Sequence, residues 1–180
     1  MKGIIATERK IMETGKVENI NTELKKEFHK IKITYFVFLI EPFFLFGIML
    51  IFSHFMGGKI ETILETSKLS KTFFRTISLV FIILSVIEYY TVAILMRRLN
   101  TIIGAVKGLV HYSSRYLNAM ILLLSIAVIP SILGFVYYLI SLDIILSSLF
   151  YLVGLVSIVR VLPRFNDFRN RYIDLSEEDI

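Results

Sequence analysis

Residues 33–56 read ITYFVFLIEPFFLFGIMLIFSHFM. Glu41 is the only Asp, Glu, Lys or Arg in this run, which Gly57 and Gly58 follow. A helix needs about 20 consecutive apolar residues to cross the hydrocarbon core of a bilayer, and this run is long enough. It therefore predicts a transmembrane helix.

Three further apolar runs follow the first one along the chain. They cover about residues 73–96, which stop at Arg97 and Arg98, then residues 117–140 and residues 142–162. Only a turn around Ser141 separates the last two, so we expect an antiparallel helical hairpin there. The sequence thus predicts an all-α integral membrane protein, with a bundle of four transmembrane helices over residues 33–162.

Composition supports this class. Hydrophobic residues make up 56% of the chain and the mean hydropathy is +0.72, whereas soluble domains contain about 45–50% apolar residues. The net charge of +5 comes from basic residues that flank the apolar runs, so we expect no nucleic-acid partner. The chain has no cysteine, which excludes disulfides and thiolate metal sites.

The distribution of Lys and Arg predicts the orientation in the membrane. Eight of them lie in residues 1–32, four in residues 97–115 and four after Ser157, against four in residues 57–75 and none near Ser141. Basic residues favour the cytoplasmic side, so both termini are expected in the cytoplasm and the protein in the plasma membrane. Residues 1–16 lack the apolar segment of a signal peptide, which makes residues 33–56 an uncleaved anchor.

Amphipathic helices are expected outside the four spans, first in the cytoplasmic segment 1–32. Its apolar residues recur at helical spacing: Val17, Ile20, Leu24, Phe28 and Ile31. This pattern predicts a helix that lies on the cytoplasmic leaflet, with its lysines at anionic headgroups. Packing against a partner protein fits the pattern equally well.

The second cytoplasmic segment and the C-terminal tail show related patterns. Residues 102–110 predict a surface helix or an extension of the helix 73–96, although Gly104 and Gly108 disfavour a helix. In the tail, residues 163–180, the aromatic residues Phe165, Phe168 and Tyr172 alternate with arginines. We interpret the tail as a short interfacial helix with an acidic end, the alternative being a solvated chain end.

Two carboxylates lie deep inside the predicted spans, away from their ends, Glu41 and Glu88. An ionised carboxylate at the bilayer centre costs about 2.5–3.5 kcal/mol on insertion scales, so such residues usually face protein or water. Because the first two helices run in opposite directions, both residues fall on the cytoplasmic side, each roughly 5 Å from the midplane. We therefore expect them to share one layer.

Possible neighbours of the two carboxylates follow from the same reasoning. Ser125 and Ser157 have the same expected depth. Ser85, Glu88 and Thr91 are three residues apart and form one polar strip. Pro42 and Pro130 are expected to bend their helices, because a proline ring frees the carbonyl group four residues earlier.

Three interpretations of the carboxylate pair remain open. In the first, Glu41 and Glu88 face each other and form a proton or cation relay. In the second, Arg160 reaches toward them as a counter-ion in a structural charge cluster. In the third, each glutamate is protonated and joins helices through a hydrogen bond to a Ser, Thr or Tyr.

The motifs for catalysis are missing from the sequence. There is no H-E-x-x-H, Walker loop or G-x-S-x-G, and His29, His54 and His111 are not placed as a ligand pair in the predicted bundle. We expect no catalytic residue, metal site or cofactor, and an enzyme is disfavoured.

The favoured function is a non-catalytic membrane subunit or assembly factor, with the lipid bilayer and other membrane subunits or copies of the chain as partners. The alternative is a small proton- or cation-coupled transporter or channel that acts as an oligomer through Glu41 and Glu88.

Overall fold

The computed structural model describes residues 2–56, 71–104 and 108–177, which are helical except for short connections and contain no strand. The all-α prediction is confirmed for this part of the chain. The helices are α1 (Lys2–Met56), α3 (Lys71–Arg97), α4 (Leu99–Ile103), α5 (Leu109–Ala127), α6 (Ile129–Ser141), α7 (Ile144–Arg160) and α8 (Phe165–Glu177).

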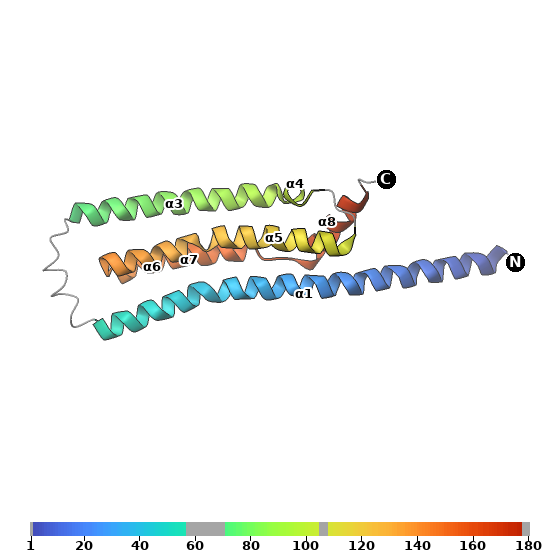
Figure 1. Ribbon diagram of the computed structural model, residues 1–180, viewed down its shortest axis with the longest axis horizontal. Coiled ribbons are helices and arrows are strands. Elements are labelled where there is room, and N and C mark those ends of the chain that lie inside the picture. Colours follow the sequence, from blue (N-terminus) through green and yellow to red (C-terminus); the bar gives the residue numbers. More distant parts are fainter. Residues whose placement is uncertain (1, 57–70, 105–107, 178–180) are drawn as a thin grey trace.

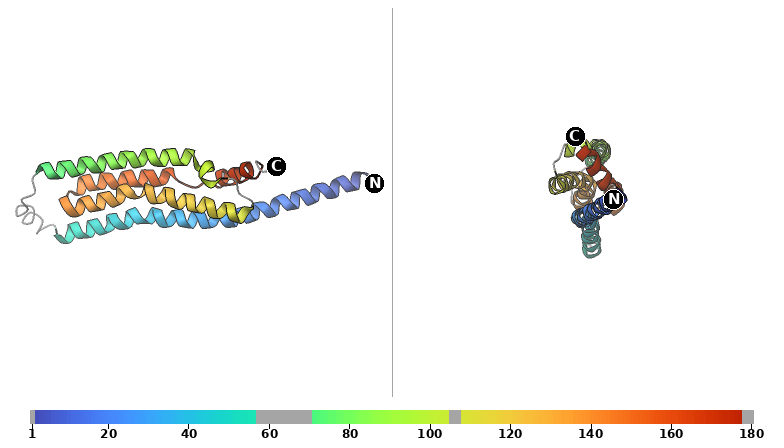
Figure 2. Two further views of the ribbon diagram at one scale, coloured as in Figure 1. Left: turned by 45° about the horizontal axis from the view of Figure 1, so that its top comes forward. Right: turned by 90° about the vertical axis from the view of Figure 1, so that its right-hand side faces the viewer.

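The long helices run side by side in an elongated bundle (Figures 1 and 2). Helices α5, α6 and α7 lie in the middle, with α1 along one side and α3 along the other. The turn between α6 and α7 lies at one end of the bundle, and both termini and α8 lie at the other. Among the described residues, α1, α3 and α5 with α6 are long and apolar enough to cross a membrane, and α7 is a fourth candidate when joined with α8 across a bend of 50°.

The third predicted span has different limits in the structure. Helix α5 already begins at Leu109 rather than at residue 117, and the helix breaks at Val128 before α6 begins at Ile129. Pro130 stands in the first turn of α6, where its missing N–H removes no helical hydrogen bond. Pro130 thus coincides with a break in the helix, whereas Pro42 lies buried inside the uninterrupted helix α1. The bends predicted at the two prolines stay predictions.

The hairpin around Ser141 is confirmed. Leu142 adopts a left-handed conformation with φ of 55°, and the side chain of Asp143 accepts hydrogen bonds from the backbone N–H groups of Ile145 and Leu146 at 3.0 and 3.1 Å. These contacts cap the first turn of α7.

Small residues allow α6 and α7 to approach closely. A Cβ atom at Gly154 would collide with Ser131 Oγ and lie 3.0 Å from the backbone nitrogen of Ser131, and one at Gly134 would lie 2.8 Å from the Cβ of Phe150. Such positions are typical of close helix packing in membranes. The hairpin therefore depends on the absence of a side chain at two places.

The N-terminal segment differs from its prediction. Residues 2–32 are not a separate helix, because they continue directly into the first apolar run as one helix, α1. From Leu24 onward their apolar face is buried within the chain itself: Leu24, Phe28 and Ile31 belong to the core formed with α5 and α8. This apolar face therefore has its partner in the same bundle, and the position of this helix relative to the membrane leaflet stays a prediction.

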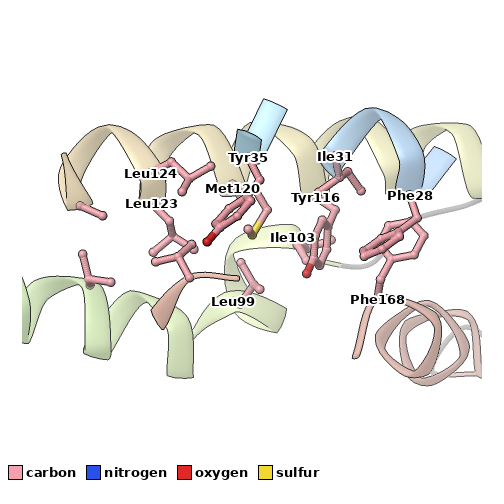
Figure 3. Packing of buried hydrophobic residues seen from close by; sticks show 14 of the residues in the cluster. Phe28, Ile31, Tyr35, Leu99, Ile103, Tyr116, Met120, Leu123, Leu124 and Phe168 are labelled. Carbon is pink, nitrogen blue, oxygen red and sulfur yellow. The ribbon is translucent and has the colours of Figure 1, made fainter. Parts of the chain in front are cut away.

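The core at this end of the bundle joins six helices, α1, α3, α4, α5, α7 and α8. Figure 3 shows Phe28 and Ile31 of α1 close to Tyr116 of α5, with Phe168 of α8 near Phe28. Leu99 and Ile103 place α4 against the same cluster. The predicted helix in the C-terminal tail is present, and it packs on the bundle through the completely buried Phe168.

The helix expected over residues 102–110 is interrupted. Helix α4 ends at Ile103, and Gly104 and Gly108 have positive φ angles of 67° and 89°. Glycine adopts positive φ angles at little cost. A right-handed helix requires negative φ angles, so the helix cannot continue through these two residues. Residues 105–107 of this prediction lie outside the described residues.

Candidate functional site

The candidate site is built around Glu88 of α3. Its side chain is buried, with 4% of its surface exposed, although it is ionisable and lies within an apolar helix. Ser157 Oγ of α7 donates a hydrogen bond to Glu88 Oε2 at 3.2 Å. The other oxygen, Oε1, is buried and has no hydrogen-bond partner in the described part of the chain. One polar atom inside the bundle is thus left for a proton or a further donor.

Helical periodicity explains the direction of this side chain. Ser85, Glu88 and Val92 lie three or four residues apart and are all buried, whereas Ile87 and Tyr90 are exposed on the other face of α3. The buried face packs on the middle layer of helices. Because Glu88 lies on this face, it is directed into the bundle rather than outward.

The polar strip predicted on α3 is only partly directed to other helices. Ser85 is buried, but its hydroxyl donates to the carbonyl of Phe81 in its own helix at 2.9 Å. Thr91 is partly buried and donates to the carbonyl of Ile87 at 2.8 Å. Among the three residues of the strip, Glu88 alone is hydrogen-bonded to another helix.

Arg160, at the C-terminal end of α7, lies near this site. Its guanidinium carbon is 4.5 Å from the centre of the Tyr89 ring, a cation–π arrangement. It is within electrostatic reach of Glu88 but forms no salt bridge with any described residue. The predicted counter-ion is therefore a neighbour of the carboxyl group without a direct bond to it.

The two predicted serine neighbours have different positions. Ser157 is buried and hydrogen-bonded to Glu88, as described above. Ser125 is exposed, because the buried face of α5 carries Met120, Leu124 and Ala127. Ser125 is therefore not directed into the core of the bundle, and its expected depth in the membrane stays a prediction.

Glu41 lies on the opposite side of the bundle from Glu88. It is partly buried on α1, next to Pro42, which lines a groove against Leu155 of α7. Since Glu88 is bonded to Ser157, both glutamates lie at a similar level along α7, but the middle layer separates the helices that carry them (Figure 1). The structure does not bring the two carboxyl groups together, and a relay through both of them stays a prediction.

Two apolar grooves flank α7, and sequence reasoning missed both. One, of about 390 Å³, lies between α3 and α7, and the other, of about 310 Å³, lies between α1 and α7. The first is lined by Ile82, Ser85, Val86, Tyr89, Tyr90, Leu146, Leu149, Phe150 and Val153. A groove is formed where two packed helices leave space between them. It therefore cannot be predicted from the apolar pattern of one helix.

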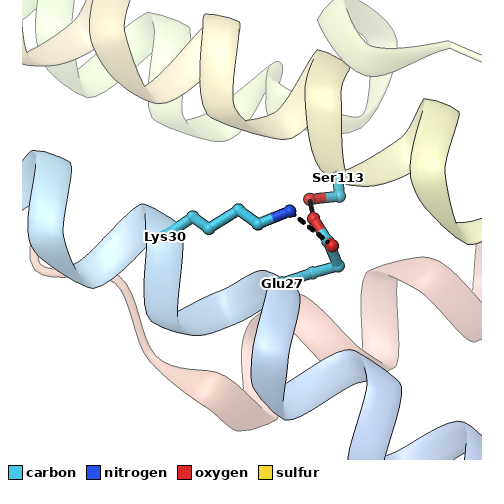
Figure 4. A network of polar contacts seen from close by, with 3 residues as sticks. All are labelled: Glu27, Lys30 and Ser113. Atoms are coloured by element: carbon cyan, nitrogen blue, oxygen red, sulfur yellow. Dashed lines mark hydrogen bonds and ion pairs between the residues drawn. The ribbon is translucent and has the colours of Figure 1, made fainter.

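Sequence reasoning also missed a polar contact between α1 and α5, at the end of the bundle that holds the termini. Figure 4 shows Glu27 of α1 between Lys30 and Ser113 of α5. Lys30 Nζ donates to Glu27 Oε1 and Ser113 Oγ to Glu27 Oε2, both at 2.7 Å. The hydrogen bonds from Lys30 and from Ser113 lower the pKa of Glu27, which lies in the charged part of α1 before residue 33. This contact ties α1 to α5.

Helix α8 is fixed to α5 by a further contact of this kind. The Tyr112 hydroxyl donates to the carbonyl oxygen of Phe168 at 2.8 Å, and the Phe168 ring lies 5.0 Å from the rings of Tyr112 and Tyr116. Arg171 of α8 also donates to Asn100 Oδ1 of α4. The C-terminal helix is therefore part of the folded unit.

The described residues contain no group of three or more His, Asp or Glu that could hold a metal ion. Comparison of the chain with protein-family models, curated proteins and solved structures found no match. The function is therefore argued from the geometry of the chain itself.

Proposed function

We propose that the chain is a non-catalytic subunit or assembly factor of a complex in the plasma membrane, with four transmembrane helices and both termini in the cytoplasm. The spans would be α1, α3, α5 with α6, and α7. Helix α7 has 17 residues and packs along α6, and a helix of this length covers about 25 Å. That length is near the lower limit for a transmembrane helix.

The charge distribution supports the proposed orientation. Both termini, α4 and α8 lie at the same end of the bundle (Figure 1). The segments that belong to this end carry 16 of the 20 Lys and Arg residues, and basic residues favour the cytoplasmic side. Helix α8 would then lie near the cytoplasmic headgroups, packed on the bundle.

The length of α1 is the observation that carries the subunit proposal. Its 55 residues correspond to about 80 Å, of which the hydrocarbon core takes roughly 30 Å. Figure 2 shows its N-terminal part extending past the other described helices. That part mixes acidic and basic residues, among them Glu8, Arg9, Lys10 and Glu13. We take this part of α1, which reaches beyond the other described helices, as the segment that would bind another protein.

Copurification tests this proposal. The native chain would be isolated in lipid nanodiscs cut directly from the membrane, beside a variant without residues 2–19 and a control in which the same residues are scrambled. We expect mass spectrometry to find a partner protein with the native chain and to lose it with both variants, while all three chains keep their thermal stability. Isolation of the native chain without a stoichiometric partner would contradict the subunit proposal.

A second candidate function is supported by Glu88 alone. A buried carboxyl group with one unpartnered oxygen can accept and release a proton, and such groups within membranes are often parts of proton or cation pathways. The chain would then act as a small proton- or cation-coupled transporter or channel and would form a homo-oligomer.

Flux measurements separate the two functions. The native chain, Glu88→Gln and Glu41→Gln would be reconstituted in vesicles with a pH gradient and a pH-sensitive dye. For a transporter we expect Glu88→Gln to abolish proton flux and Glu41→Gln to retain most of it, because Glu41 lies across the bundle from Glu88. Equal dye response in native and Glu88→Gln vesicles rules this function out.

A further inference from the structure

The groove between α3 and α7 has a cation at one end. Both helices run toward the end of the bundle that holds the termini, so the groove extends from the level of Ile82 to that of Tyr90 on α3. The eight residue steps between them correspond to about 12 Å. Tyr89 lines the groove, and the guanidinium of Arg160 lies over its ring. A positive charge therefore lies beside the Tyr89 end of this apolar groove.

The walls of this groove suit a hydrocarbon chain. Val86 on α3 and Leu149 and Val153 on α7 are exposed along its sides, and the buried Phe150 also lines it. The groove is about 12 Å long. This length is close to the thickness of one leaflet, which is half of a hydrocarbon core of roughly 30 Å. One acyl chain of a membrane lipid fits these dimensions.

Arg160 has its hydrogen-bonding capacity free for a ligand. Its guanidinium carries five N–H donors, none of which donates to a described residue of the chain. The acidic group within its electrostatic reach is Glu88, whose carboxyl is buried and bonded to Ser157. A phosphate diester is the anion that a planar guanidinium binds with two parallel hydrogen bonds.

We propose that this groove is a binding site for an anionic phospholipid, with an acyl chain between α3 and α7 and the phosphate on Arg160. Charge complementarity selects the lipid over an apolar helix of a partner protein, since such a helix brings no anion to the exposed guanidinium. The net negative headgroup favours an anionic lipid over a zwitterionic one.

Native mass spectrometry of the full chain tests the site. The chain would be incubated with equal amounts of phosphatidylglycerol and phosphatidylcholine that carry the same acyl chains, and the retained lipids counted. We expect the native chain to prefer phosphatidylglycerol. Arg160→Gln should reduce this preference about fivefold, the contribution of one basic residue near an anionic headgroup. Val153→Trp should reduce retention of both lipids, because the indole fills the groove.

Matched controls make the result specific. Arg75→Gln removes an exposed arginine at the other end of α3, and Val159→Trp adds the same indole on α7 outside the groove. Both should behave like the native chain. If Val153→Trp does not fold, Leu149→Trp fills the same groove from an exposed position and decides the point.

Three results would overturn the proposal. The native chain could retain both lipids equally, or Arg75→Gln could reduce the preference as much as Arg160→Gln. Alternatively, Val153→Trp could leave lipid retention unchanged while a copurified protein is lost, which would assign the groove to a partner helix.

Discussion

The middle and the flanks of this bundle have similar apolar composition but opposite burial. In the most apolar stretch of α5 and α6, 50% of the residues are buried, against 17% in α3 and 11% in α1. The middle helices use their side chains to hold the bundle together, whereas α1 and α3 present theirs outward. Hydrophobicity alone therefore does not tell which residues stabilise the fold and which ones face lipid or a partner.

This contrast assigns different consequences to similar substitutions. A change on a buried face alters internal packing, and its cost appears in the free energy of unfolding. A change on an exposed face of α1 or α3 leaves internal packing intact and affects binding. Pairs of the same residue type, one from each region, test this separation directly.

Phenylalanine provides the pair with the largest expected effect. Phe168 is 0% exposed and packs against Tyr112, Tyr116 and Phe28, whereas Phe44 of α1 is 66% exposed. We expect Phe168→Ala to lower the free energy of unfolding by about 3–5 kcal/mol, the usual cost of removing a buried aromatic ring. Chemical unfolding in detergent micelles, followed by circular dichroism, measures this.

Phe44→Ala is the matched control and should leave the unfolding midpoint nearly unchanged, because no internal contact is lost. Equal destabilisation by the two substitutions would show that the flank of α1 is buried, in an oligomer for example, and would remove the contrast.

Glycine provides the second pair. A Cβ atom at Gly154 collides with Ser131, whereas one at Gly47 of α1 meets no atom within 4 Å. Gly154→Ala should therefore destabilise the chain by about 1–3 kcal/mol through overpacking. Gly47→Ala should instead stabilise it by up to about 1 kcal/mol, because alanine is the better helix former. Thermal unfolding of both variants in the same detergent compares them.

The double variant Gly154→Ala with Ser131→Gly tests the contact itself. Removing the Ser131 side chain takes away the atoms that the new methyl group meets first, so part of the lost stability should return. Additive losses from the two substitutions would mean that the contact between α6 and α7 is not the cause.

The general fold could be predicted from the sequence because it follows from local patterns. Apolar runs marked the helices, Ser141 marked the turn of the hairpin, and Pro130 marked the break between α5 and α6. In the same way, the apolar spacing around Leu24 and Phe28 indicated a helical face. The pattern alone did not tell that this face is buried by α5 and α8 of the same chain.

The candidate site was predictable in part for a similar reason. The position of a residue along its helix follows from counting at 1.5 Å per residue, which placed Glu88 and Ser157 at one level. Which helices are neighbours does not follow from counting. Glu41 therefore lies across the middle layer from Glu88, and Ser125 lies on the exposed face of α5.

Smaller effects are expected where a flanking helix meets the middle layer. Ser113 of α5 and Lys30 of α1 both donate to Glu27, and Lys30 is mostly exposed. Ser113→Ala removes one of the two hydrogen bonds to Glu27 and should therefore lower the free energy of unfolding by about 1 kcal/mol. Urea unfolding of native and variant chains in one detergent measures this.

The dependence of this contact on pH has a definite sign. Because the two hydrogen bonds lower the pKa of Glu27 below its ordinary value of 4.5, the folded state holds the proton less tightly than the unfolded state. The stabilisation is therefore fully present above this ordinary value and disappears as the pH falls through the lowered pKa of the folded state. Unfolding measured from neutral pH down to about 3 should show native and Glu27→Gln curves that converge in acid. A constant separation would mean that Glu27 acts through packing, and α1 would then be joined to α5 by its apolar contacts alone.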